Sequence, residues 1–253
     1  MNGLFAKDWR RMAGWLLPLF AGLWLSGCQV AHMALPQDLQ SETSELAVEG
    51  RPLLIFNDSF QFGPYHVTDV DRGWTRGGGY SASIGASEFS SSEATQKYEF
   101  SVSEPDRPAW AVQCATTADW SQLETEGFLG GRFGVEFSSN QHLVCTLTQD
   151  GGGTLSKLAM SLSASANETA LRGIMMDGAT RIDISGTHRL DSTPLQVRTP
   201  TGYIFRIGGR PVGAVEVINM GTVWLNDSVT PEIRSALAAT SAVLLLYQDI
   251  KGS

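Results

Sequence analysis

The densest group of titratable side chains in this sequence runs from His66 to Asp71. His66, Asp69 and Asp71 are candidate metal ligands, because imidazole and carboxylate groups bind divalent cations. The stretch Asp69-Val70-Asp71-Arg72-Gly73 also matches a fragment of a calcium-binding loop. A complete loop needs further oxygen ligands and a terminal acid, whereas Gly77-Gly78-Gly79 follows here. A solvated strand end and turn therefore explains the group better than a metal site, and we expect no cofactor.

A second group consists of Asp183, His188 and Asp191. A histidine near an aspartate is half of a hydrolase dyad, but no Gly-x-Ser-x-Gly motif accompanies it, so we favour a hydrogen-bonded turn. The glycine runs Gly77–Gly79 and Gly151–Gly153 lack the Gly-Lys-Ser/Thr ending of a phosphate loop. No residue is therefore assigned a catalytic role.

The tryptophans are candidates for a surface that stacks on sugars or peptides. Trp110 falls on the apolar face of an alternating run and is expected in the core. Trp74 and Trp120 lie beside expected loops and form the more exposed pair.

The N-terminus has the organisation of an export signal. Lys7, Arg10 and Arg11 precede an apolar run from Met12 to Trp24, which at roughly 13 residues is too short to span a membrane as a helix. The run ends at Leu25-Ser26-Gly27-Cys28, which resembles the lipobox of bacterial lipoproteins.

The lipobox resemblance implies that residues 1–27 are removed and that Cys28 carries a diacylglycerol and an acylated amine. Several acyl chains hold a protein firmly on a membrane, whereas one chain does so only marginally. Gln29 follows the cysteine in place of the aspartate associated with inner-membrane retention. The resemblance thus implies anchoring in the outer membrane, on its periplasmic face. A retained membrane helix and an unlipidated secretory signal are the alternatives.

The charge of the chain argues against nucleic acid as a partner. Residues 1–27 hold three of the 18 basic and one of the 26 acidic residues, which leaves 15 − 25 = −10 for the mature chain. Nucleic acids and anionic headgroups both require a basic surface. We expect the membrane, through the lipid anchor, and an envelope protein to be the partners.

If Cys28 is lipidated, Cys114 and Cys145 remain as an even pair in an exported, oxidising context. Each cysteine lies in a run of alternating apolar residues, so both are expected to point into the core from two strands. We expect a disulfide between them, with two buried free thiols as the alternative.

The rest of the chain is predicted to form two segments. Residues 28–50 are polar and predict a flexible or locally ordered tether. Residues 51–253 predict one β-rich domain, because short runs with a period of two are separated by glycine-rich turns. One long surface loop is expected from Arg72 to Ala94. The fold class is mainly β, an antiparallel barrel or sandwich.

A helix is predicted at the C-terminal end. Thr230-Pro231-Glu232 has the residue types of a helix start, and from Ser235 to Gln248 the chain carries no charge and has apolar residues on every side. A helix that is apolar all round is buried. We therefore expect a buried helix over residues 231–250.

The order of these last elements resembles the end of tubby-like and LURP-one-related domains, in which an antiparallel barrel wraps a hydrophobic C-terminal helix. The resemblance rests on Tyr203–Ile207, the Gly208-Gly209 turn, Arg210–Val217, Thr222–Leu225 and the helix. It implies the fold alone, since members bind phosphoinositides through basic residues and this chain has no matching cluster.

These features favour a lipid-anchored, non-enzymatic interaction or assembly module of the cell envelope. One alternative is a carrier of a lipid or other hydrophobic ligand, which requires a cavity near the helix. The other is an envelope hydrolase, which requires His66 or His188 to meet an acid and a nucleophile.

Overall fold

The computed structural model describes residues 30–51, 59–84, 87–126, 132–149, 157–165, 170–176, 180–191 and 193–248. The predicted signal peptide and the Leu25–Cys28 lipobox lie outside these residues, and their assignment stays a prediction. The elements are α2 (Gln37–Gln40), β1 (Thr43–Glu49), β2 (Phe60–Phe62), β3 (Tyr65–Arg72), β4 (Arg76–Ile84), β5 (Ser87–Ser103), β6 (Trp110–Glu126), β7 (Arg132–Gln149), β8 (Lys157–Ala164), β9 (Arg172–Met176), β10 (Arg181–Thr187), β11 (Arg189–Leu190), β12 (Thr193–Gln196), β13 (Gly202–Ile207), β14 (Arg210–Glu216), β15 (Thr222–Asn226) and α3 (Pro231–Leu246).

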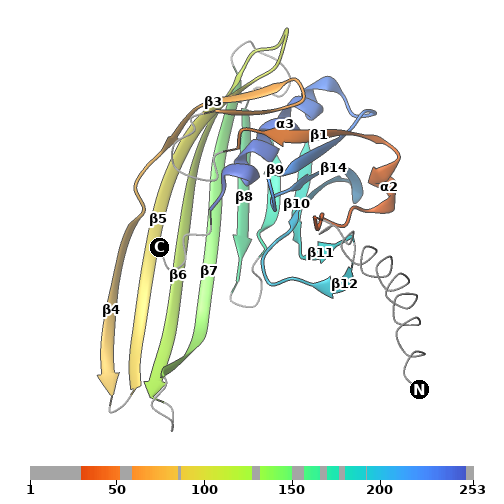
Figure 1. Cartoon of the computed structure of the whole chain (residues 1–253). Coiled ribbons are helices and arrows are strands. Elements are labelled where there is room, and N and C mark those ends of the chain that lie inside the picture. The colour runs from red at the N-terminus through yellow and green to blue at the C-terminus, as the bar shows by residue number, and fades with distance from the viewer. Residues whose placement is uncertain are drawn as a thin grey trace, which may run out of the picture. The chain divides into compact units, whose positions relative to one another are not determined.

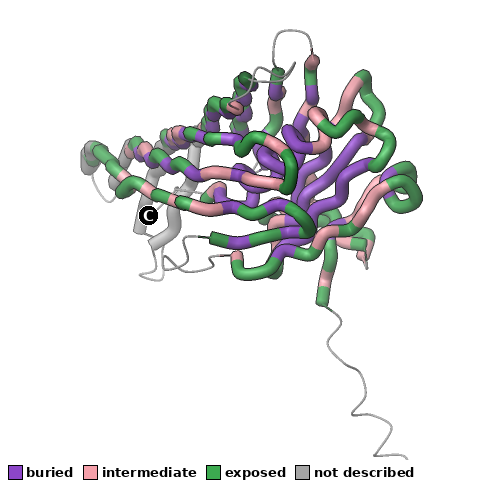
Figure 2. Tube along the Cα trace, turned by 90° about the horizontal axis from the view of Figure 1, so that it is seen from above, coloured by how far each residue is buried: buried purple, intermediate pink, exposed green. Residues whose placement is uncertain are grey.

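Twelve antiparallel strands form a closed barrel. Their order is β3-β2-β1-β15-β14-β13-β10-β9-β8-β7-β6-β5, and β5 pairs back to β3. Along β8 exposed and buried residues alternate without exception, as expected when one face of a strand lines a core. Figure 2 shows the same alternation along other strands. The prediction of an antiparallel β fold is confirmed, and the architecture is a barrel.

Three strands continue beyond the barrel. β5, β6 and β7 have 17, 17 and 18 residues, and only part of each is needed to close the ring. β4 pairs with residues 87–95 of β5, next to the part of β5 that pairs with β3. We call β4 and the extensions of these three strands the projecting sheet, which Figure 1 shows leaving the barrel at one end.

The projecting sheet replaces the surface loop expected from Arg72 to Ala94, which was wrong. Residues 76–84 and 87–94 pair as β4 and β5. Gly77, Gly78 and Gly79 are exposed. Because these glycines lie outside the barrel, they face no core, and the alternation of apolar residues that marks a strand is not required of them.

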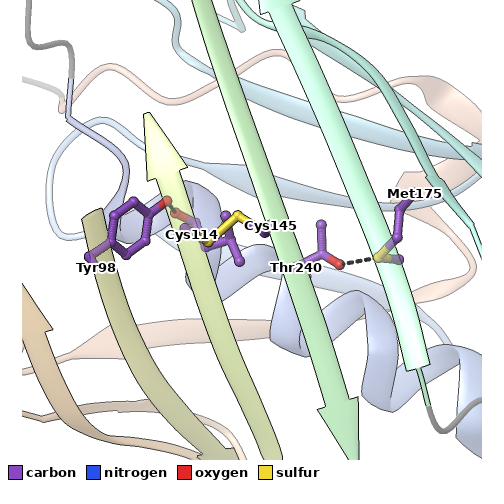
Figure 3. The surroundings of a disulfide bond; sticks show 6 residues. Tyr98, Cys114, Cys145, Met175 and Thr240 are labelled. Carbon is purple, nitrogen blue, oxygen red and sulfur yellow. Dashed lines mark hydrogen bonds between the residues drawn. A yellow bond between two sulfur atoms is a disulfide. The ribbon is translucent and has the colours of Figure 1, made fainter. Parts of the chain in front are cut away.

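Cys114 on β6 and Cys145 on β7 are direct partners in the register, and their sulfurs lie 2.04 Å apart as a disulfide. Both side chains are buried, as the alternating pattern predicts. Figure 3 shows the disulfide between Tyr98 on one side and the pair Thr240–Met175 on the other. The bond therefore lies in the core, where the strands face the helix.

The helix α3 provides the centre of this core. Thr230 begins it, because its Oγ1 accepts a hydrogen bond from the backbone N–H of Ile233, and Pro231 takes the first position. Every residue from Ser235 to Leu246 is buried, whereas the first turn lies nearer the surface. The predicted buried helix is confirmed, although the structure ends it at Leu246 instead of Ile250.

The polar side chains of α3 find partners inside the barrel. The indole N–H of Trp110 donates to Ser235 Oγ at 2.9 Å, and the Thr240 hydroxyl lies 2.9 Å from Met175 Sδ. Thr240 and Ser241 also donate to backbone carbonyls one turn earlier in the helix. These bonds satisfy groups that would otherwise cost free energy to bury.

The N-terminal segment forms a second, outer core. Met33 and Leu39 pack with Ile204, Ala214 and Trp224 on the outside of β13, β14 and β15. These three strands are therefore covered on both faces, which explains why their sequences are nearly continuous apolar runs.

The expectation of a tether over residues 28–50 was accordingly wrong from Met33 onward. β1 pairs with β15 and with β2 as a strand of the barrel, so the domain does not begin at Arg51. β1 has only one buried residue, Val48, because its outer face is exposed. Its sequence is consequently as polar as that of a linker.

Among the residues that the structure describes, no helix is long and apolar enough to cross a membrane.

Candidate functional site

A pocket of about 370 Å³ opens where α3 ends, and we call it the mouth. It lies between the start of the projecting sheet and the segment after β12. The residues that shape it are Arg51, Gln141, Arg198, Tyr203, Leu244 and Tyr247. Its volume falls within the range of small-molecule sites.

The end of a helix creates a need for hydrogen-bond donors. The last carbonyls of a helix lack partners within it and carry the negative end of its dipole. Arg51 meets this need, because its Nε donates to the Leu245 carbonyl at 3.0 Å. Its Nη1 donates to the Val217 carbonyl at 2.8 Å, so the guanidinium joins the helix end to the loop after β14.

Tyr98 supplies another donor, since its hydroxyl lies 3.3 Å from the Val243 carbonyl. The guanidinium carbon of Arg72 lies 6.0 Å from the centre of the Tyr98 ring, within the range of a cation–π contact. Arg72 and Tyr98 are register partners on β3 and β5. Arg51 and Tyr98 thus bond to the last turn of α3, and Arg72 lies behind Tyr98.

The electrostatics of this end are positive. Burial, followed by repulsion from Arg72, lowers the pKa of Arg51 to about 10. Burial also lowers the pKa of Arg72, although the nearby Tyr98 opposes the shift. Burial raises the pKa of Tyr98, which keeps the phenol neutral. A negative charge placed here would relieve the repulsion between the two guanidinium groups.

No carboxylate in the described parts of the chain forms an ion pair with Arg51 or Arg72. In the same residues, the Nη1 of Arg72 is buried and has no hydrogen-bond acceptor. Buried donors normally have acceptors, and an unsatisfied one costs free energy. Arg51, which lines the mouth, and the neighbouring Arg72 therefore give this end of the barrel the chemistry to bind a carboxylate or a phosphate.

The candidate metal ligands are not gathered into a site. His66, Asp69 and Asp71 are exposed on β3, where a β-bulge between Thr68 and Asp71 shifts the register and gives Asp69 a φ of 56°. The described residues contain no group of three His, Cys, Asp or Glu side chains that could hold a metal ion.

The second titratable group is spread along one strand and its following turn. Asp183 forms an ion pair with Arg181 at 2.9 Å, near the start of β10. His188 follows the end of β10, about 17 Å further at the usual rise per residue. Asp191 lies in the turn after β11, and its backbone N–H donates to the His32 carbonyl. The arrangement is that of a strand and a turn.

The tryptophans do not form one surface. Trp74 is exposed, whereas Trp110 is buried in the barrel as predicted. Trp224 is buried in the outer core. The side chain of Trp120 and the Gly151–Gly153 run lie outside the described residues.

The sequence did not point to the mouth. Arg51 adjoins a run that gives no sign of contact with a helix almost two hundred residues later. The glycine and serine runs predicted a loop that begins at Arg72, whereas β3 continues to Arg72 past a bulge that shifts the alternation of inward and outward residues. The shift is accompanied by a positive φ at Asp69, which the sequence does not reveal.

No protein family, curated protein or solved structure matches this chain.

Proposed function

We propose that this chain is a lipid-anchored protein of the cell envelope that acts without catalysis, as a binding or assembly module. The anchor would be Cys28, in the outer membrane and on its periplasmic side. The mouth would be the binding surface, and its ligand a carboxylate or phosphate group attached to an apolar body. The observation that supports this most directly is Arg51, which lines the mouth, with Arg72 close enough to repel it and no carboxylate paired with either arginine in the described residues.

The apolar part of the ligand follows from the rest of the lining. Tyr203, Leu244 and Tyr247 line the pocket with Arg51, and Tyr247 is the one of these three side chains that stays partly exposed. An anion without an apolar body would leave the apolar part of the pocket in contact with water. Covering that area contributes about 25 cal/mol per Å² to the free energy of binding. A ligand with both parts therefore fits the pocket better than an inorganic ion.

The carrier alternative has one observation in its favour, the apolar lining of the mouth. A carrier holds its ligand in the barrel interior, and here Ser235–Leu246 of α3 are buried in that interior. The hydrolase alternative needs a histidine held by an acid and a nucleophile. The side chain of His66 makes no hydrogen bond to such a group among the described residues, and Asp183 is far along β10 from His188.

The binding function can be tested by thermal unfolding of the full, mature chain with small soluble ligands. Hexyl phosphate and hexanoate combine an anion with an apolar body, and hexanol is the uncharged control. A ligand at 100 times its Kd stabilises by about 2.7 kcal/mol. We expect the two anions to raise the Tm by several degrees and hexanol to leave it unchanged.

Two variants make the test specific. Arg51→Gln should abolish the shift, while Arg181→Gln, at the opposite end of the barrel, should retain it. Equal shifts for both variants would place the binding elsewhere and refute the role of the mouth. Mass spectrometry of the mature N-terminus tests the anchor separately, with acylated Cys28 as the expected result.

A further inference from the structure

The N-terminal segment is attached to the barrel almost immediately after the predicted lipid site. Met33 forms a β-bridge with Leu190, and the N–H of Ala34 donates to the Arg189 carbonyl at 3.0 Å. The carbonyl of His32 accepts from the N–H of Asp191 at 3.1 Å. Residues 32–34 are thus joined to the β11–β12 hairpin by backbone hydrogen bonds.

A buried carboxylate strengthens this attachment. Glu216, which is 1% exposed, accepts the backbone N–H of Met33 at 2.7 Å, and His32 Nδ1 lies 3.4 Å from the same oxygen. Met33 itself is 2% exposed, and Gly202 leaves the space that its sulfur occupies. We call His32–Ala34 together with Glu216 the clamp.

The clamp lies at the same end of the barrel as the mouth. Glu216 is followed directly by Val217, whose carbonyl accepts from Arg51. The hairpin held by the clamp continues into Arg198, which lines the mouth. The projecting sheet leaves the barrel at this end too (Figure 1). The lining of the mouth accordingly includes Gln141 of β7 and Arg198 after the hairpin.

The length of chain available to the lipid is short. His32 lies four positions after Cys28, and an extended chain covers at most about 3.5 Å per position, or about 14 Å in all. The other end of the barrel is about 25 Å further away, because the eight residues of β8 run from one end to the other.

We infer that the mouth end of the barrel faces the membrane and that the β11–β12 hairpin lies at the phospholipid headgroups, whose phosphates would be the anions offered to the mouth. This inference rests on the proposed acylation of Cys28. The hairpin suits such a position, because Leu195 is 73% exposed and Arg189 and Arg198 flank it. An apolar side chain between cations matches the layered chemistry of a membrane interface.

The acyl chains, and not the overall charge, set this orientation. The projecting sheet carries six acidic residues against three basic ones, so it has no attraction to an anionic surface. The orientation should therefore appear on a zwitterionic membrane as well.

A fluorescence-quenching experiment tests the inference. The acylated full chain is placed in phosphatidylcholine liposomes in which a fraction of the lipid carries a nitroxide on its headgroup. Leu195→Cys or Lys157→Cys is labelled with bimane. With Cys28 acylated and Cys114 bonded to Cys145, the introduced thiol is the one that reacts. Lys157 is also exposed, but it begins β8 at the far end of the barrel.

We expect the label at residue 195 to lose more than half of its emission and the label at residue 157 to lose less than a tenth. Adding Glu216→Ala opens the clamp, lengthens the free chain and should reduce the quenching at residue 195 at least two-fold. Equal quenching at the two positions, in a preparation whose mass spectrum shows acylated Cys28, would overturn the inference and leave the anchor intact. An unmodified Cys28 would instead refute the proposed anchoring, and the inference with it.

Discussion

Removal of the disulfide should destabilise the barrel mainly through the unfolded state. Cys114 and Cys145 are direct partners across β6 and β7, so the native strands stay paired when the bond is broken. The bond closes a loop with a sequence separation of 31 residues. The loop-entropy relation then gives about 3–4 kcal/mol at 25 °C, which corresponds to a Tm lower by about 10 °C for a chain of this size.

The measurement compares urea unfolding of the oxidised chain with that of the chain reduced while unfolded and then refolded in reductant. Reduction avoids the cavity that a substitution in this buried site would add. The Cys114→Ala/Cys145→Ala variant is the control, since reductant should leave its stability unchanged. A loss below about 1 kcal/mol on reduction would refute the reasoning, because it would mean that the unfolded chain already keeps these strands together.

Three further substitutions test the packing around the helix and the clamp. Arg51→Met should lower the free energy of unfolding, measured by chemical denaturation, by about 2 kcal/mol. Two charge-assisted hydrogen bonds near the end of α3 are lost, and the removed cost of burying the guanidinium offsets part of that loss; an unchanged stability would contradict the capping role of Arg51. Ser235→Ala should cost about 1–3 kcal/mol by leaving the indole N–H of Trp110 unpaired, and the double variant with Trp110→Phe should cost less than the two single changes together. Gly202→Ala should lower the free energy of unfolding by more than about 2 kcal/mol and expose the N-terminal segment to proteolysis, since a Cβ there would lie 2.1 Å from the sulfur of Met33. Gly78→Ala is the control and should be neutral, because its Cβ would meet no atom within 4 Å; equal effects of the two substitutions would contradict the contact with Met33.

Much of the fold follows from local pattern. The alternation around Cys114 and Cys145 predicted that both cysteines face the core, and the charge-free run from Ser235 to Gln248 predicted a buried helix. Both are local consequences of burial on one side or on all sides of an element.

The parts that failed depend on contacts far along the chain. β1 is polar because one of its faces meets water, and its membership of the barrel depends on β15 near the other end of the sequence. The mouth depends on the end of α3, a bulge at Asp69 and the carbonyl of Val217 coming together. No pattern within a window of ten or twenty residues contains that information.

The pairing of β1 with β15 also sets the order in which the chain can fold. The Ser44 hydroxyl and the Asp227 carboxylate that meet at this seam are 183 residues apart, so the ring cannot close before nearly the whole chain is available. Closing so long a loop is slow, since its entropic cost precedes any reward from the contacts. A ribosome-bound or partly translocated chain would contain β1 but would still lack β15, its partner in the barrel. The barrel therefore cannot close until synthesis is nearly complete. Export in the unfolded state requires such a delay.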